Sequence, residues 1–350
     1  MCSYFIDIWN KVFFNSIFTE WISKMMKLIK WFFVLLGATL VMSANSQTNV
    51  YPSQPVKFVV TFTPGGAADL TARILGDYLS RLWGQQVVVE NKIGAGGSIG
   101  VDQVFRAKPD GYTLLIASNT HAINQALYSN LQFDLRKDFI SVASLTSSPI
   151  ALAVNPKLSI KNLKEFTALL RSQPDKVAYA TCGVATAHHF AMELYKHATN
   201  TIAIHIPEKG CTPAVLDAVS GQVDVVISSL ATVLPFSKDQ KLRIIGLTSR
   251  DRSASIPEAV PFRESGVPEL SNYEVENYYG LLAQASVPKE ILAKLEIDLK
   301  KAVEAPEVRS KLAIAGLDVF WGSSPQFTSL ISSDIEKFKR AIQIANIKPE

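Results

Sequence analysis

The sequence predicts an α/β protein of two lobes, in which each lobe is a mainly parallel sheet flanked by helices. Two observations support this prediction. From Tyr51 onward, short apolar strands alternate with segments of helical periodicity, as in parallel sheets that are covered on both faces. The chain also has 350 residues, which is more than one hydrophobic core usually organises.

The first lobe is expected to comprise residues 47–148 and 277–350. Apolar residues recur at helical spacing from Leu70 to Leu82, and Gly84 ends that helix because glycine is common just past a helix end. The expected elements of this lobe are strands at 58–62, 87–90 and 113–117, an apolar segment at 278–283, and helices at 70–82, 99–107, 289–303, 307–315 and 326–345.

The second lobe is expected to comprise residues 149–276, with the chain crossing between lobes near Pro149 and Glu276. Thr212 before Pro213 is typical of a helix start. The segment 249–272 is rich in proline, serine and charge, which indicates a surface crossing. The expected elements of this lobe are strands at 150–154, 177–180, 202–206, 223–227 and 242–247, and helices at 163–170, 185–198 and 213–219.

Residues 25–46 have the composition of a secretory signal peptide. Lys27 and Lys30 precede the apolar run from Trp31 to Met42, and small or polar residues follow as far as Ser46. A membrane anchor is the alternative, but a run of about a dozen residues is short against the roughly 20 that span a bilayer. Residues 1–24 do not fit this pattern. We therefore expect translation to begin at Met25 or Met26 and the protein to be exported to the periplasm.

The charge of the chain predicts no nucleic-acid partner. The formal net charge is +4, and the four lysines and two acidic residues of positions 1–46 account for half of it, so residues 47–350 carry about +2. Lysine and arginine residues are scattered and form no basic run that could follow a phosphate backbone. The sequence has no heptad repeat either, so a monomer is the default expectation.

The cysteines of the second lobe leave two interpretations open. In an oxidising compartment Cys182 and Cys211 can pair in a disulfide, or they can remain two buried free thiols. The five histidines form no recognisable zinc pattern, and Ile99 stands where a dinucleotide-binding loop has its third glycine. We therefore expect no metal and no cofactor.

Glycine-rich loops join strands to helices in the first lobe. One runs from Thr63 to Asp69, and the next contains Gly94 to Gly97. Glycine lets the backbone turn tightly, and the N–H groups at a helix start attract anions. Open α/β sheets bind ligands beyond their strand ends, so the two loops together predict a binding face, although each alone could simply turn a corner. The loop from Thr181 to His188 has the same position in the second lobe and offers neutral donors.

Several motifs along the chain resemble those of one protein family. They are Tyr51-Pro-Ser-Gln-Pro55, Pro64-Gly-Gly-Ala-Ala-Asp69, Val88-Val-Glu-Asn91 with Gly94-Ala-Gly-Gly97, Pro109-Asp-Gly-Tyr112, Asp138-Phe139, Gly221-Gln-Val223, Tyr279-Gly-Leu-Leu282, Pro306-Glu-Val-Arg309 and Ile347-Lys-Pro-Glu350. Together they cover nearly all of the chain from Tyr51, in family order. On these motifs the sequence resembles the Bug family, the extracytoplasmic solute-binding proteins of tripartite tricarboxylate transporters.

The resemblance implies a two-lobed periplasmic-binding-protein fold, type II-like, with a ligand cleft between the lobes. It implies no catalysis, a small organic acid as ligand, hinge closure on that ligand, and membrane permease subunits of the transporter as partners. Carried over by matching position, it implies ligand contacts at Thr63, Pro64, Gly65, Gly66, Ala67, Ala68, Asp69, Gly96, Ser118, Asn119, Thr181, Gly183, Thr186, His188 and Ser228. Thr120 and His121 follow the same strand as Ser118, where the family also lines its cleft.

This sequence departs from the family pattern at three places near the expected cleft. Ser228-Ser229 stands where many relatives have an Asp-Asn pair that helps to recognise a ligand's amino or other polar group, which disfavours an amino-acid ligand. Glu208 stands where a tyrosine is usual, and Cys182 and Cys211 replace small residues. The identity of the ligand therefore does not follow from the resemblance.

Two other functions compete with this one. Gly96 to Gly100 matches the Gly-x-Ser-x-Gly elbow of α/β serine hydrolases, but such an elbow places its serine directly at a strand end, whereas several residues separate Glu90 from Ser98. A binding protein could also present its ligand to a membrane sensor kinase instead of a permease. The sequence does not distinguish these two uses of one fold.

Overall fold

The computed structural model describes residues 20–30 and 51–344. Residues 1–50 and 51–350 form two units, and each is described by itself. In the first unit, residues 20–30 are helical and exposed; most of the expected extension (1–19) and of the expected signal peptide (31–46) lies outside the described residues, as does the segment 345–350. None of the described helices is long and apolar enough to cross a membrane.

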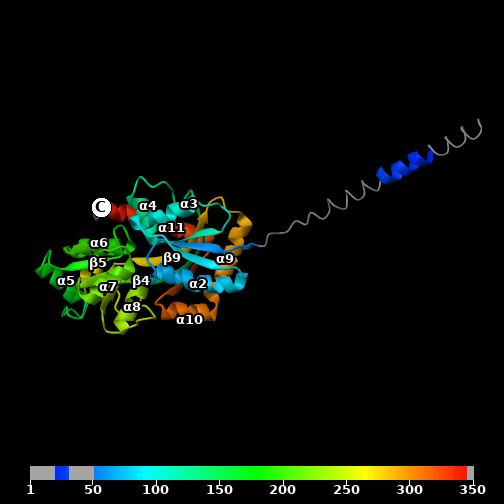
Figure 1. Cartoon of the computed structure of the whole chain (residues 1–350). Helices are drawn as coiled ribbons and strands as arrows, with labels where there is room; N and C mark the ends of the chain where they lie inside the picture. Colours follow the sequence, from blue (N-terminus) through cyan, green and yellow to red (C-terminus); the bar gives the residue numbers. More distant parts are fainter. Residues whose placement is uncertain (1–19, 31–50, 345–350) are drawn as a thin grey trace, which may run out of the picture. The chain divides into compact units, whose positions relative to one another are not determined.

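The second unit alternates strands with helices (Figure 1). Its strands are β1 (Val56–Val60), β2 (Val87–Asn91), β3 (Thr113–Ser118), β4 (Phe139–Val154), β5 (Ala178–Thr181), β6 (Ile204–Pro207), β7 (Val225–Ser229), β8 (Arg243–Leu247), β9 (Glu276–Gln284) and β10 (Asp318–Gly322). Its helices are α2 (Ala67–Trp83), α3 (Ser98–Phe105), α4 (Asn119–Leu127), α5 (Leu163–Ser172), α6 (Ala187–Thr199), α7 (Cys211–Ser220), α8 (Leu230–Lys238), α9 (Lys289–Glu304), α10 (Pro306–Ile314) and α11 (Ser324–Ile344), with 3-10 turns η1 (Ala95–Gly97), η2 (Phe262–Glu264) and η3 (Pro268–Leu270).

Each strand and helix expected from the sequence is present, with ends shifted by a few residues. The elements that were not expected are α4, α8, β10 and the part of β4 before Ile150. The helix start expected at Thr212 is different in detail, because α7 begins at Cys211 and its N-cap is Gly210.

The sheet is curled and mixed rather than mainly parallel. In its first part β1 pairs in parallel with β2 and β3, while β9 is antiparallel to both β3 and β4, and β10 is antiparallel to β4. The antiparallel pairing of β9 with β4 follows from the path of the chain. The chain leaves this part of the sheet along β4 and returns along the neighbouring β9, so the two strands run in opposite directions.

Strand β4 joins the two parts of the sheet. Its residues from Phe139 to Pro149 pair with β9, and its residues from Ile150 to Val154 pair with β7 and β8. In the second part β5 pairs in parallel with β6 and β7. The sequence predicts a strand only at the second of these segments and a crossing near Pro149, so the continuity of β4 is a finding of the structure.

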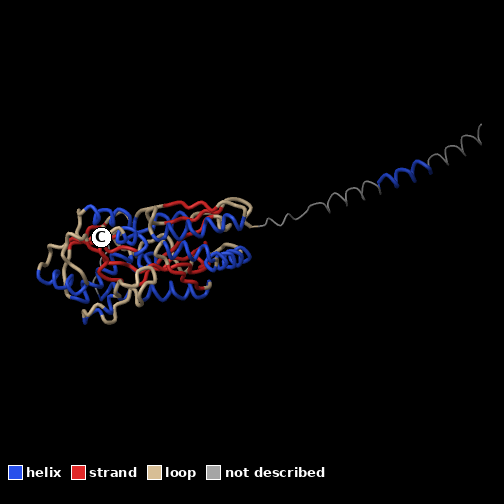
Figure 2. Tube along the Cα trace, turned by 90° about the horizontal axis from the view of Figure 1, so that it is seen from below, coloured by secondary structure: helices blue, strands red, loops and turns tan. Residues whose placement is uncertain are grey.

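Helices cover both faces of the sheet, and the apolar core lies between them. In Figure 1, α4 and α11 lie on one side of β9, and α2 and α10 lie on the other; Figure 2 shows most of the strands lying between helices in a second view. One core cluster contains side chains of α2, α9 and α10, and another contains side chains of α4, α5, α6 and α11. The ring of Phe190 on α6 meets that of Phe338 on α11 edge to face, so the second cluster extends across both parts of the sheet.

Candidate ligand-binding site

The glycine-rich and polar loops of the chain gather at the carboxyl ends of parallel strands. In the first part of the sheet they follow β1, β2 and β3, and in the second part they follow β5, β6 and β7. Each of these strands leads into a helix, directly or through a short turn. The site is therefore built from helix N-termini, as expected for a ligand site at the strand ends of an α/β sheet.

Loops from both parts of the sheet enclose a small space, here called the inner cavity. It is lined by Phe62, Gly66, Ala67, Ala68, Ser118, Thr120, His188, Cys211, Ser229, Asn277 and Tyr279. The space has room for about one water molecule. Of the expected ligand contacts, Gly66, Ala67, Ala68, Ser118 and His188 line it, and so does Thr120, which was expected in the cleft lining.

Five helices start at the inner cavity. Gly66 is the N-cap of α2, Ser118 that of α4 and Ser229 that of α8, while His188 and Cys211 lie in the first turns of α6 and α7. At α2, α7 and α8 no side chain caps the helix start. The first N–H groups of a helix have no partner within the helix, and they carry the positive end of its dipole. The cavity is therefore suited to an anion.

A hydrogen-bonded group of neutral side chains forms the floor of the inner cavity. Ser229 Oγ lies 2.9 Å from His188 Nε2 and 3.1 Å from the hydroxyl of Tyr279. The side-chain amide of Asn277 donates to the Tyr279 hydroxyl at 2.7 Å and to Ser229 Oγ at 3.2 Å. His188 Nδ1 and Asn277 Oδ1 are buried and have no hydrogen-bond partner among the residues that the structure describes, which leaves them available to a ligand.

Burial keeps these groups uncharged. Burial lowers the pKa of His188 to about 3, so the imidazole is neutral at physiological pH. Burial also raises the pKa of Tyr279 above its usual value, although hydrogen bonds from Ser229 and Asn277 act in the opposite direction. Among the residues that line the inner cavity there is no lysine or arginine. An anion would thus be held by dipoles alone.

A larger space, here called the outer cleft, opens beside Phe62. It has a volume of about 630 Å³ and is lined by Thr61, Phe62, Ile93, Gly94, Ala95, Gly96, Gly97, Tyr128, Cys182, Gly183, Val184, Thr186, Pro207, Glu208, Lys209 and Gly210. Gly96, Gly183 and Thr186 were expected at the ligand site from the sequence. They line this cleft and not the inner cavity.

The remaining expected residues hold the loops in place. The Asp69 carboxylate accepts hydrogen bonds from Gly65 N (2.9 Å), Arg73 Nε (2.8 Å) and Asn91 Nδ2 (2.9 Å), and so braces the loop before α2. Burial by itself raises the pKa of Asp69, but these hydrogen bonds outweigh it and hold the pKa below its usual range. Gly65 has a φ of +79°, which glycine adopts without strain.

Asn119, Thr181 and Ser228 are buried behind the cavity walls. The amide of Asn119 donates to the carbonyl of Glu276 at 2.6 Å. Thr181 Oγ1 lies 2.7 Å from His205 Nε2. Ser228 Oγ lies 3.5 Å from Cys182 Sγ, while its neighbour Ser229 faces the cavity.

Thr63 and Pro64 take part in contacts between the two parts of the molecule. The hydroxyl of Thr212 on α7 donates to the carbonyl of Pro64 at 3.0 Å, and Ala187 N on α6 donates to Thr120 Oγ1 at 3.1 Å. Gly210 lies so close to Thr63 that a Cβ at this position would collide with the threonine side chain. These contacts close the inner cavity from both sides.

The sequence does not predict Phe62, Asn277 and Tyr279 at the site, and it predicts Cys211 and Ser229 only near the cleft, as departures from the family pattern. Asn277 and Tyr279 are two positions apart on β9, so they share one face of that strand, and this spacing was visible in the sequence. Which face meets the cavity was not visible, because β9 is buried on both faces. The same ambiguity applies to Ser228 and Ser229, which are both buried.

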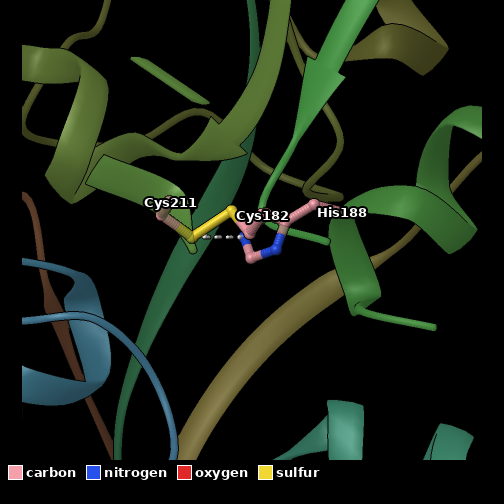
Figure 3. A group of neighbouring side chains, drawn as sticks. All are labelled: Cys182, His188 and Cys211. Atoms are coloured by element: carbon pink, nitrogen blue, oxygen red, sulfur yellow. Dashed lines mark hydrogen bonds between the residues drawn. A yellow bond between two sulfur atoms is a disulfide. The ribbon is translucent and has the colours of Figure 1, made fainter. Parts of the chain in front are cut away.

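A disulfide joins Cys182 and Cys211, with an S–S distance of 2.09 Å and a Cα–Cα distance of 4.1 Å (Figure 3). This decides between the two interpretations left open by the sequence. His188 Nε2 lies 3.9 Å from Cys211 Sγ, and the ligand atoms of the two cysteines and His188 all lie within 4.8 Å of one another. Metal coordination by cysteine requires the thiolate, and sulfurs that are bonded to each other do not supply it.

Comparisons with known proteins agree with this architecture. Residues 71–347 match the model of the family described as "Tripartite tricarboxylate transporter family receptor". The chain is 32% identical over 313 residues to the "UPF0065 protein in tcbD-tcbE intergenic region" of Pseudomonas sp. (strain P51), covering 88% of this chain and 93% of that protein. It is 29% identical over 313 residues to Protein BugT of Bordetella pertussis (strain Tohama I), covering 89% of this chain and 95% of that one.

Solved structures show the same two-lobed fold of periplasmic solute-binding proteins. A protein of R. palustris with adipate has a TM-score of 0.82 at 26% identity, covering 86% of this chain and 100% of that one. MatC of Rhodopseudomonas palustris with bound malate has a TM-score of 0.78 at 27% identity, with coverages of 83% and 100%. The periplasmic binding protein BugD has a TM-score of 0.81 at 27% identity, with coverages of 86% and 100%. The chain therefore belongs to the Bug family of tripartite tricarboxylate transporter receptors.

Proposed function

We propose that this protein captures a small carboxylate-bearing metabolite in the periplasm and delivers it to the permease of a tripartite tricarboxylate-type transporter, without catalysing a reaction. The observation that carries the proposal is the convergence of five helix starts on one cavity that contains no fixed positive charge. The helix dipoles stabilise a bound carboxylate. Because no fixed positive charge holds it, the carboxylate can also be released, as a transport receptor requires. Family relatives with adipate and malate support the ligand class.

The proposed contacts divide between the two lobes. Gly66, Ala67 and Ala68 at the start of α2, with Ser118, would bind a carboxylate from the lobe formed by residues 47–148 and 277–350. His188 and Ser229 would meet it from the lobe formed by residues 149–276. The inner cavity has room for about one water molecule, so a ligand must enter when the contacts of Thr212 and Thr120 are broken. Binding would then select the closed state.

The absence of catalysis is proposed on the arrangement of the residues that a hydrolase would use. Ser98 is the first residue of α3, at the side of the outer cleft, and within the described chain its side chain makes no hydrogen bond to a histidine. His188 is hydrogen-bonded to Ser229, the N-cap of α8, and no carboxylate within residues 20–30 and 51–344 is hydrogen-bonded to its ring. A serine nucleophile needs a base, and that base needs an orienting group.

Export to the periplasm is proposed from the N-terminal segment and from the disulfide. Residues 25–30 are helical and residues 31–46 lie outside the described residues. Disulfides persist in oxidising compartments and are rare in the cytosol of mesophiles. The Cys182–Cys211 bond therefore supports an extracytoplasmic location.

Thermal unfolding of residues 47–350 against a panel of small mono-, di- and tricarboxylates, including adipate and malate, tests the proposal. A ligand that binds only the folded state raises its stability, by about 2.7 kcal/mol at a concentration of 100 times Kd. We expect a selective rise in Tm for one or a few carboxylates. A folded protein that responds to no carboxylate would contradict the proposed ligand class.

A Gly66→Val variant makes the test specific for the site. Gly66 has φ −78° and ψ 167°, so valine fits the backbone, but its side chain would stand at the start of α2. We expect this variant to fold and to lose the ligand-dependent rise in Tm. Leu82→Val, at an exposed position near the other end of the same helix, is the control and should keep the rise.

A further inference from the structure

The Cys182–Cys211 disulfide connects two loops that close the ligand site. Cys182 lies in the loop between β5 and α6, and Cys211 is the first residue of α7, which follows β6. Strands β5 and β6 are parallel neighbours, so both cysteines lie at the same edge of the sheet. Figure 3 shows the bond beside the His188 side chain, which Cys211 Sγ approaches to 3.9 Å.

Both connected loops make contacts across the cleft. On the Cys211 side, Gly210 packs against Thr63 and Thr212 donates to the Pro64 carbonyl. On the Cys182 side, α6 begins after the loop, and Ala187 N donates to Thr120 Oγ1. The bond thus joins two contact surfaces that otherwise belong to separate loops.

The same bond joins two residues that line the site itself. Cys211 lines the inner cavity and Cys182 lines the outer cleft. The sulfur of Cys182 also contacts Ser228 Oγ, next to Ser229 on the cavity floor. A movement of either sulfur atom would therefore also move side chains that are proposed to bind the ligand, or their direct neighbours.

We propose that the Cys182–Cys211 disulfide is a positioning element of the ligand site, which holds the two closing loops as one unit, so that its reduction weakens carboxylate binding. The inference rests on the proposed function and deepens it, because it makes capture of the ligand dependent on the redox state of the compartment. Preorganised loops bind more tightly because less ordering is needed when the ligand arrives.

The reduction is a balanced thiol–disulfide exchange. A thiolate of an external dithiol attacks Cys182 Sγ from the outer cleft, the Cys182–Cys211 bond breaks, and Cys211 leaves as a thiolate that is protonated by water. The second thiol of the reductant then displaces Cys182, which becomes a free thiol. Two electrons pass to the protein, and the dithiol becomes a cyclic disulfide.

Ligand binding and reduction must then oppose each other. If reduction weakens binding by a given factor, bound ligand resists reduction by the same factor, because the two equilibria are linked. Closure adds a kinetic barrier, since the sulfur-bearing residues Cys182 and Cys211 are only 4% and 5% exposed in the closed arrangement. A saturating carboxylate should therefore slow the attack of a dithiol.

Calorimetric titration of residues 47–350 before and after treatment with dithiothreitol tests the inference. The probe is malate or adipate, whichever gives the larger rise in Tm, and a chelator in all buffers keeps the freed thiols and His188 from holding a metal. We expect Kd to rise on the order of tenfold after reduction. Mass spectrometry after alkylation should show slower reduction when the probe is present.

The double variant Cys182→Ser/Cys211→Ser separates the bond from other effects of the reductant. It should bind weakly and respond no further to dithiothreitol. Equal affinity of the oxidised and reduced protein would overturn the inference while leaving the proposed function intact. Unfolding on reduction, seen by circular dichroism, would also overturn it, because the bond would then be a structural staple. If neither form binds any carboxylate of the panel, the proposed function fails and the inference with it.

Discussion

The loop before α2 depends on one buried carboxylate. Asp69 accepts hydrogen bonds from Gly65, Arg73 and Asn91, so it links the helix, the loop and the end of β2. The family resemblance placed Asp69 among ligand contacts, while the structure places its carboxylate within the loop. A single side chain thereby positions the helix start that is proposed to meet the ligand.

The substitution Asp69→Asn should destabilise the protein by about 1 to 3 kcal/mol at pH 7, because hydrogen bonds to a buried charged group are lost. The folded-state pKa of Asp69 is depressed relative to the unfolded chain. Its contribution is therefore fully present above about pH 4 and is lost as the pH falls through the folded-state pKa. Urea unfolding between pH 3 and pH 7 should show a smaller acid-induced loss in the variant.

Asp77→Asn is the matched control for this experiment. Asp77 lies on the same helix and pairs with Arg81, but both side chains are about half exposed. Exposed ion pairs contribute about 0 to 1 kcal/mol. If Asp69→Asn behaves like this control at both ends of the pH range, the bracing role of Asp69 is wrong.

At the scale of elements, strand β9 decides how the site is assembled. It lies between β3 and β4, is buried along almost its whole length, and carries both Asn277 and Tyr279 to the inner cavity. Gly280 follows directly on this strand. A Cβ there would meet the ring of Phe327 on α11 and lie 2.7 Å from the carbonyl oxygen of Ala143 on β4.

We expect Gly280→Ala to lower the free energy of unfolding by about 1 to 3 kcal/mol, since an extra carbon in a packed core forces its neighbours apart. Denaturant titration followed by circular dichroism measures the change. Ile314→Ala, at a residue that is 74% exposed, should stay within about 0.5 kcal/mol of the wild type. A Gly280→Ala protein as stable as this control would show that α11 can move away without cost.

At the scale of the whole molecule, the two-lobed fold explains how a cavity with room for one water can serve a larger ligand. The contacts of Thr212 with Pro64 and of Ala187 with Thr120 span the cleft, whereas β4 runs continuously through both parts of the sheet. Opening of the cleft can break these contacts without disturbing strand β4. Hinge motions of this kind are common in binding proteins that close around a ligand.

Small-angle X-ray scattering of residues 47–350 should show a smaller radius of gyration when the carboxylate found by thermal shift is saturating. The Gly66→Val protein at the same ligand concentration provides the control and should stay expanded. An unchanged radius of gyration with a tightly bound ligand would contradict closure by hinge motion and would favour a site that admits its ligand by local loop movement.

The sequence alone determined most of the strands and helices along the chain, the class of fold and the family, but not α4, α8, β10 or the first part of β4. Periodicity, helix-ending glycines and strand-to-helix loops are local signals, so they can be recognised without the folded structure. The site loops after β1 and β5 were recognised for the same reason. Of the expected residues, those at the start of α2 line the inner cavity, because a helix start is defined by its own neighbours in sequence.

The tertiary structure decided what depends on contacts between distant segments. It placed β9 antiparallel within the first part of the sheet, turned Ser229 rather than Ser228 to the cavity, and joined Cys182 to Cys211. Strands buried on both faces show no polar alternation, so their orientation is set only by the layers that cover them. A disulfide likewise depends on the distance between two loops, which the fold sets and local sequence does not.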